Sequence, residues 1–175
     1  EPRKNILNLI RGYHLYFTTN SSLHSSIPKL VIAGKPGWYY QPIFDLVDQL
    51  NLQNQIVFTG YLPNHQLPHL YKNALCLTYV PFYEGFGLPV VEALLSKTPV
   101  ITSNVSSLPE AAGPNSILID PYNHRQLADE IIRVLSDDGL RYKMVENGYR
   151  YAQSTFNSER TASKVMEAYQ NLLNY

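Results

Sequence analysis

Short apolar runs alternate with amphipathic segments along the 175-residue chain, and this alternation constrains the fold more than any other feature. The first two runs lead directly into Gly34 and Gly60. Strands that alternate with helices predict a parallel sheet with right-handed crossovers, which means a Rossmann-like, doubly wound α/β domain. The predicted strands are 29–33, 55–59, 74–79, 99–102 and 116–119. The predicted helices are 4–19, 42–50, 64–72, 89–96, 124–136, 139–153 and 158–173, and 20–26 is a predicted Ser-rich loop.

Composition excludes several classes of protein. Fourteen Lys and Arg residues balance fourteen Asp and Glu residues, so a nucleic-acid binder with a broad basic surface is excluded. A single cysteine, Cys76, excludes an internal disulfide framework and a multi-cysteine metal site. No apolar stretch approaches the roughly 20 residues that span a bilayer, and no signal peptide is visible, so we expect a cytoplasmic protein. The sequence has no internal repeat and no low-complexity linker, so residues 1–175 are predicted to form one domain. Because the sequence starts without Met, we expect this domain to be part of a longer protein.

In a parallel sheet, ligands bind beyond the carboxyl ends of the strands, and the loop after the third predicted strand is rich in glycine. Gly85 and Gly87 lie one residue apart, and Pro89 is predicted to be the first residue of the next helix. The main-chain N–H groups of Gly87 and Leu88 would then face outward at a helix N-terminus and could bind an anion. The alternative is a tight strand-to-helix turn without a ligand.

Two carboxylates, Glu84 and Glu92, flank this loop with seven residues between them. Carboxylates would repel a bound phosphate, but they would accept hydrogen bonds from neutral hydroxyl groups on either side of it. A ligand with hydroxyls on both sides of a diphosphate is a nucleotide sugar. The alternative is that Glu92 is a first-turn acid that complements the helix dipole, while Glu84 is solvated.

The segment from Glu84 to Ala93, with the sequence EGFGLPVVEA, resembles the signature of the retaining GT-B glycosyltransferases of the glycogen synthase and mannosyltransferase superfamily. Further elements in family order resemble its lysine motif, its second-strand loop, its base-binding turn and the segment after the signature helix. The lysine motif corresponds to Arg3-Lys4-Asn5, and the second-strand loop to residues 34–38. The base-binding turn corresponds to residues 57–61, and the segment after the signature helix to residues 99–104 and 107–110. The resemblance extends from residue 1 to about 173, and implies the C-terminal lobe of a GT-B fold.

The resemblance implies a role for each matching residue. Glu84 becomes the catalytic residue, lying against the hydroxyls of the donor sugar, and Glu92 binds the ribose. Lys4 contacts the diphosphate. The main chain of Gly85, Phe86, Gly87 and Leu88 holds the distal phosphate and sugar, and that of Gly60 and Tyr61 holds the base.

The chain departs from the family pattern in two places. Phe82 stands where Ser is common, and Asn157-Ser158 replaces a frequent Ser-Trp pair. The family's arginine five residues before the lysine falls ahead of residue 1, and Arg3 is a neighbour of Lys4 rather than its equivalent.

No Asp-x-Asp pair is present, so we expect no metal cofactor, and fixed cations and N–H groups must then stabilise the diphosphate. Lys35 either joins Lys4 in this role or is a solvated loop residue. The five histidines, His14, His24, His65, His69 and His124, show no metal-ligand spacing. Residues 38–40 (WYY) form either an aromatic platform for a sugar or a loop packed on the next helix.

The leading hypothesis is the donor-binding domain of a retaining glycosyltransferase that transfers a hexose from a UDP- or GDP-linked sugar. Its expected partners are that donor, its own N-terminal lobe and a glycan or lipid-linked acceptor at the inner face of the membrane. A non-hydrolysing sugar-nucleotide epimerase and a non-catalytic nucleotide-binding module remain alternatives. Tight binding of a nucleotide sugar would favour the glycosyltransferase and the epimerase over the non-catalytic module. A glycosyl-transfer assay would then separate the glycosyltransferase from the epimerase.

Overall fold

Five short strands, all paired in parallel, run through the domain in the computed structural model, which describes residues 1–20 and 27–173. The predicted loop at 20–26 therefore lies almost wholly outside the described residues. The strands are β1 (Leu30–Ala33), β2 (Ile56–Gly60), β3 (Leu77–Tyr79), β4 (Val100–Ser103) and β5 (Ile117–Ile119). The α-helices are α1 (Ile6–Thr19), α2 (Gln41–Gln49), α3 (Leu67–Asn73), α4 (Leu88–Leu95), α5 (Leu108–Ala112), α6 (His124–Ser136), α7 (Asp138–Thr155) and α8 (Ser158–Leu173).

The parallel arrangement confirms the predicted fold class, although the strand ladder is interrupted. β1 pairs with β2, and β3, β4 and β5 form a separate sheet in that order among the described residues. β3 and β5 have only three residues each and offer few ladder hydrogen bonds. Packing joins the two sheets, because Ile56 of β2 belongs to the same buried cluster as Ile101 of β4.

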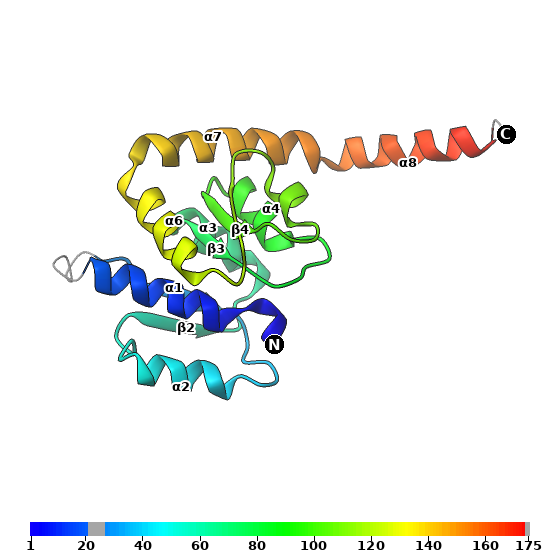
Figure 1. Ribbon diagram of the computed structural model, residues 1–175. Helices are drawn as coiled ribbons and strands as arrows, with labels where there is room; N and C mark the ends of the chain where they lie inside the picture. The colour runs from blue at the N-terminus through cyan, green and yellow to red at the C-terminus, as the bar shows by residue number, and fades with distance from the viewer. Residues whose placement is uncertain (21–26, 174–175) are drawn as a thin grey trace.

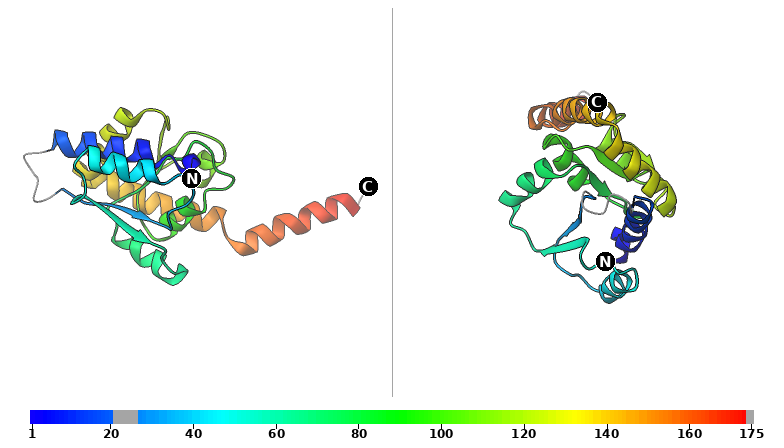
Figure 2. Two further views of the ribbon diagram at one scale, coloured as in Figure 1. Left: turned by 90° about the horizontal axis from the view of Figure 1, so that it is seen from below. Right: turned by 90° about the vertical axis from the view of Figure 1, so that its left-hand side faces the viewer.

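Helices cover both faces of the strands, as a doubly wound fold requires. α1, α2 and α6 lie on one side, and α3 and α4 lie on the other (Figure 2). The first side buries one hydrophobic cluster, which includes Ile10 of α1 and Leu127 of α6. The second side buries another, which includes Val90 of α4 and Leu108 of α5. The helices leave the carboxyl ends of the strands uncovered, and the loops that follow the strands lie at this edge.

Several boundaries differ from the predictions. The first helix is preceded by a 3-10 turn, η1 (Pro2–Lys4), and a second turn, η3 (Asn64–Gln66), precedes α3. The short helix α5 was not predicted, because its five residues show too little periodicity.

The predicted helical C-terminal region is confirmed by α6, α7 and α8. α8 extends away from the body of the domain (Figure 1) and exposes apolar side chains, among them Met166, Tyr169 and Leu173. Within the described ranges, no helix is both long and apolar enough to cross a membrane.

Candidate functional site

The loop between β3 and α4 carries the predicted glycines, and the structure gives them different reasons to be glycine. Gly87 is the N-cap of α4 with a φ of 93°, in the left-handed region. A Cβ there would lie 3.0 Å from the Cβ of Ala111 and 3.1 Å from Cδ2 of Leu108, so a larger residue would be strained and would displace these side chains. A Cβ on Gly85 would meet nothing within 4 Å. The loop therefore has a rigid end at Gly87 and an open face at Gly85.

Helix α4 begins one residue earlier than predicted, at Leu88, so Pro89 is its second residue. Glu92 becomes the fifth residue of the helix, and the first turn holds no acidic residue. The alternative that Glu92 is a first-turn acid is therefore wrong. Its side chain is exposed at the surface and accepts a hydrogen bond from the Tyr71 hydroxyl at 3.1 Å. Burial, and then the neighbouring Glu92 carboxylate, raise the pKa of Tyr71, which keeps that hydroxyl a donor.

Glu84 is the centre of a charged cluster at the carboxyl end of β3. Its Oε2 accepts hydrogen bonds from Lys4 Nζ at 2.8 Å, from Arg3 Nη1 at 3.1 Å and from the Tyr79 hydroxyl. Lys4 Nζ also lies 2.5 Å from the Tyr79 oxygen. Only 16% of the Glu84 side chain is exposed. This partial burial acts to raise the pKa of Glu84, but the bonds from Lys4, Tyr79 and Arg3 outweigh it and lower the pKa to about 2. Glu84 is thus ionised at any physiological pH.

The main chain of Glu84 is also fixed. Its N–H donates to Ser106 Oγ at 3.1 Å, and its carbonyl accepts from Ser107 Oγ at 2.9 Å. The N–H of Gly85 donates to the other carboxylate oxygen, Oε1, at 3.2 Å. The carboxylate is therefore held in one orientation, as a preorganised acceptor.

The cations of the cluster come from the first residues of the chain, which Asn5 positions. Asn5 has left-handed backbone, with a φ of 58°, and is 3% exposed. Its Nδ2 donates to the carbonyls of Val80 and Pro121, both at 2.8 Å. These bonds fix the start of α1 against the ends of β3 and β5, and so carry Lys4 to Glu84.

Sequence reasoning identified Glu84 and Lys4 but gave no role to two members of the cluster. Arg3, set aside as a neighbour of Lys4, donates both to Glu84 and to the carbonyl of Tyr83 at 2.8 Å. Tyr79 was placed only within a strand. Its position as the last residue of β3, directly before the glycine-rich loop, was the available signal.

The remaining predicted residues make contacts of their own. Lys35 and Tyr61 follow β1 and β2, and Lys35 Nζ lies 5.1 Å from the centre of the Tyr61 ring, a cation–π contact. Gly60, at the end of β2, has a φ of 66° and open space around it. Phe86 packs edge-on against Phe156, with ring centres 5.7 Å apart. Leu88 is 60% exposed.

Among the described aromatic residues at 38–40, only Tyr40 has an observed ring contact, and the sugar platform stays a prediction. Tyr40 packs edge-on against Phe44 of α2, with ring centres 5.9 Å apart, as loop packing predicts. Trp38 and Tyr39 remain 69% and 68% exposed.

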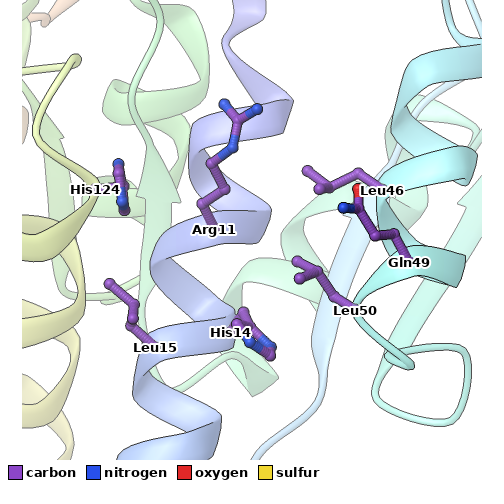
Figure 3. A pocket seen from close by; sticks show the side chains of 7 residues that line it. All are labelled: Arg11, His14, Leu15, Leu46, Gln49, Leu50 and His124. Carbon is purple, nitrogen blue, oxygen red and sulfur yellow. The ribbon is translucent and has the colours of Figure 1, made fainter.

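A cavity of about 300 Å³ lies elsewhere, over α1 between α2 and α6 (Figure 3). Its lining residues on α1 begin at Arg11, about two turns beyond Lys4. Its lining contains no carboxylate: Arg11, His14, Leu15, Leu46, Gln49, Leu50 and His124. Glu84 and Glu92 therefore do not line this cavity. Among the described residues, no group of three His, Cys, Asp or Glu side chains could hold a metal ion.

Comparison with known proteins gives consistent results. Residues 1–151 match the family described as glycosyl transferases group 1. O-antigen chain mannosyltransferase B of Escherichia coli is 34% identical over 172 residues, which are 98% of this chain and 44% of that protein. The present chain thus spans less than half of this relative.

Solved structures also resemble this domain over most or all of its length. Sucrose-phosphate synthase from Thermosynechococcus elongatus gives a TM-score of 0.84 at 27% identity, over 99% of this chain and 43% of that one. The C-terminal domain of a glycosyl transferase group 1 family protein from Francisella tularensis gives a TM-score of 0.78 at 25% identity, over 90% of this chain and 82% of that one.

Proposed function

Because this chain belongs to the glycosyl transferases group 1 family and has the fold of a C-terminal GT-B domain, we propose that it is the donor-binding domain of a retaining glycosyltransferase. The enzyme transfers a hexose from a UDP- or GDP-linked sugar to a glycan or lipid-linked acceptor. The similarity to an O-antigen mannosyltransferase favours mannose as the hexose. A separate N-terminal lobe supplies the acceptor site, and the reaction takes place in the cytoplasm, at the inner face of the membrane.

The observation that carries this proposal is the fixed, ionised carboxylate of Glu84 beside Lys4 and an open glycine loop. In the proposed complex, Glu84 accepts hydrogen bonds from the donor sugar hydroxyls. Lys4 and the main-chain N–H groups of the loop from Gly85 to Leu88 stabilise the charge that develops on the leaving diphosphate. Lys35, in the loop after β1, is proposed to add a second cation.

Glu92 is proposed to bind the ribose. Its carboxylate is exposed and has one neutral donor, Tyr71, so it retains acceptor capacity for two vicinal hydroxyls. The main chain at Gly60 and Tyr61 contacts the base. No metal takes part in this proposal, since the cations and N–H groups are already present.

Calorimetric titration of the 175-residue chain with GDP, UDP, ADP and their sugar conjugates tests the proposal. We expect one nucleotide and its conjugate to bind, and Glu92→Ala to weaken both by about tenfold to a hundredfold, because a charge-assisted hydrogen bond of roughly 1.5–3 kcal/mol is lost. Glu146→Ala, which removes a carboxylate from α7, should leave affinity unchanged. Equal affinity in wild type and Glu92→Ala would contradict the assignment of the ribose site.

A transfer assay separates this proposal from the epimerase alternative. The complete polypeptide should move sugar from labelled donor to acceptor, while the 175-residue chain should bind donor without turnover. Positioning by the second lobe accounts for this difference, since correct orientation of reactants is worth roughly 7–11 kcal/mol of the barrier. Turnover by the 175-residue chain with a simple acceptor would show that the lobe is a complete catalyst.

A further inference from the structure

The parallel ladder is broken between β1 and β3, and among the described residues each of these strands has one edge without a strand partner. β1 pairs only with β2. The N–H groups of Leu30 and Gly34 donate to carbonyls at the two ends of β2, at 3.1 and 2.9 Å. Because main-chain groups alternate between the two sides of a parallel strand, those of Val31 and Ala33 face away from β2. This edge of β1 therefore offers donors and acceptors to a further strand.

β3 has a free edge of the same kind. The N–H of Leu77 donates to the carbonyl of Pro99 at 2.8 Å, on the side of β4. By the same alternation, Thr78 presents its main-chain groups to the side away from β4. On that side the carbonyl of Val80 accepts the side-chain bond from Asn5. The free edge of β3 is thus the side on which the chain begins.

Burial shows the effect of a missing neighbour. β4 has a strand on each side and is buried at all four of its positions. β1 consists of four apolar residues, the pattern of a parallel strand that is buried on both faces, yet none of the four is buried. Val31 remains 42% exposed, although Val57 lies opposite it in the ladder. β1 therefore has the sequence of a central strand in the environment of an edge strand.

The connections between the strands indicate what belongs in the gap. α2, α3, α4 and α5 each join one strand to the next strand of the chain, and all the observed pairings are parallel. α1 leads into β1 in the same way, but no strand precedes it in residues 1–20. A strand directly before α1 would complete one more βαβ unit with the usual right-handed crossover.

The first residues lie where such a strand would end. The main-chain nitrogen of Glu1 donates to the carbonyl of Trp38, in the loop after β1, at 3.0 Å. Two residues later, the carbonyl of Arg3 accepts from the N–H of Phe82, in the loop after β3, at 3.0 Å. The backbone of residues 1–3 therefore bridges the segments that follow the two broken edges, as the last residues of an inserted strand would.

We infer that the segment directly before Glu1 in the complete polypeptide forms a parallel strand between β1 and β3 and joins the two sheets into one. This strand, of about five or six residues, pairs with Val31 and Ala33 on one side and with Thr78 on the other. The solved C-terminal domain from Francisella tularensis is matched over 82% of its own length, so a domain of this kind extends beyond the matched part. The domain therefore begins before residue 1.

The inserted strand also supports the charged cluster. It ends at the residues that carry Arg3 and Lys4, so pairing on both sides ties these two cations to the sheet next to Glu84. The inference goes beyond the proposed function and does not depend on it, because it concerns the sheet and not the ligand.

Hydrogen exchange at single-residue resolution tests the inference on the 175-residue chain, on that chain extended by the roughly ten residues that precede it, and on the complete polypeptide. We expect the amides of Val31, Ala33 and Thr78 to exchange at least about tenfold more slowly in both longer proteins, because a ladder then closes over them. The amides of Leu30 and Leu77 face β2 and β4 and are the matched controls, so their exchange should slow by a smaller factor.

A replaced extension separates a specific strand from any added chain. Gly-Ser repeats of the same length form a flexible coil instead of a strand. They should leave the three amides as fast as in the 175-residue chain and the urea midpoint unchanged. The native extension should raise the midpoint.

Three results would overturn the inference. Fast exchange of Val31, Ala33 and Thr78 in the complete polypeptide would show that nothing pairs with these edges. Protection in the complete polypeptide but not in the extended chain would assign the gap to another segment or to a second copy. Slow exchange already in the 175-residue chain at low concentration would show that the sheets need no inserted strand. None of these measurements involves nucleotide, so failure here is distinguishable from failure of the proposed function.

Discussion

The Tyr79 hydroxyl lies between a lysine and a carboxylate, and removing it in Tyr79→Phe tests whether the charged cluster stabilises the fold. The hydroxyl accepts from Lys4 and donates to Glu84. Hydrogen bonds to charged groups are worth about 1.5–3 kcal/mol each. Lys4 and Glu84 still bond each other at 2.8 Å, and 32% of the Lys4 side chain is exposed to water. We therefore expect a loss of only about 1–2 kcal/mol in the free energy of unfolding at pH 7.

Urea unfolding at several pH values measures this loss and its cause. A carboxylate whose folded pKa is depressed stabilises the fold above its unfolded pKa, and the stabilisation disappears as the pH falls through the folded pKa. For Glu84 that window extends from about 4.5 down to about 2. Tyr79→Phe removes one of the three side-chain donors to Glu84, so the folded pKa of Glu84 moves closer to 4.5. The difference between wild type and variant should narrow as the pH falls through this window.

Two outcomes would refute this reasoning. A difference that stays constant from pH 7 to pH 3 would show that Tyr79 acts by packing and not through Glu84. No difference at pH 7 would show that water replaces the hydroxyl at no cost. Tyr142→Phe, on the exposed surface of α7, is the control and should match wild type at every pH.

Three further predictions concern the loop and the donor. Glu84→Gln should leave affinity for the free nucleotide nearly unchanged but weaken binding of its sugar conjugate; equal losses in calorimetry would contradict the placement of Glu84 against the sugar. Gly87→Ala should cost about 2–4 kcal/mol of stability from its φ of 93° and its short contacts, whereas Gly85→Ala, with open space, should cost little; comparable urea midpoints would contradict this. Magnesium or EDTA should change donor affinity by less than about twofold, and a strict requirement for magnesium in calorimetry would overturn metal-free binding.

The fold could be predicted because its determinants are local. Each apolar run and each helical repeat is visible within a window of a few residues, and these give the strands and helices in the correct order. The interruption of the ladder between the two sheets could not be predicted, because pairing depends on register between distant segments. The start of α4 differed by one residue because Pro89 is tolerated at either of the first two positions of a helix, and the left-handed N-cap at Gly87 selects the second.

The charged cluster illustrates why site residues are harder to predict than strands. Arg3 and Glu84 are 81 residues apart in the sequence, and a pattern of residue types does not indicate that they meet. Their contact depends on Asn5, whose left-handed backbone turns the chain into α1 and whose side chain joins the ends of β3 and β5. The spacing of the signature segment therefore identifies Glu84 and Glu92, because both carboxylates are expected to face the ligand. The groups that fix Glu84 follow from tertiary structure, and the buried Asn5 positions two of them, Arg3 and Lys4.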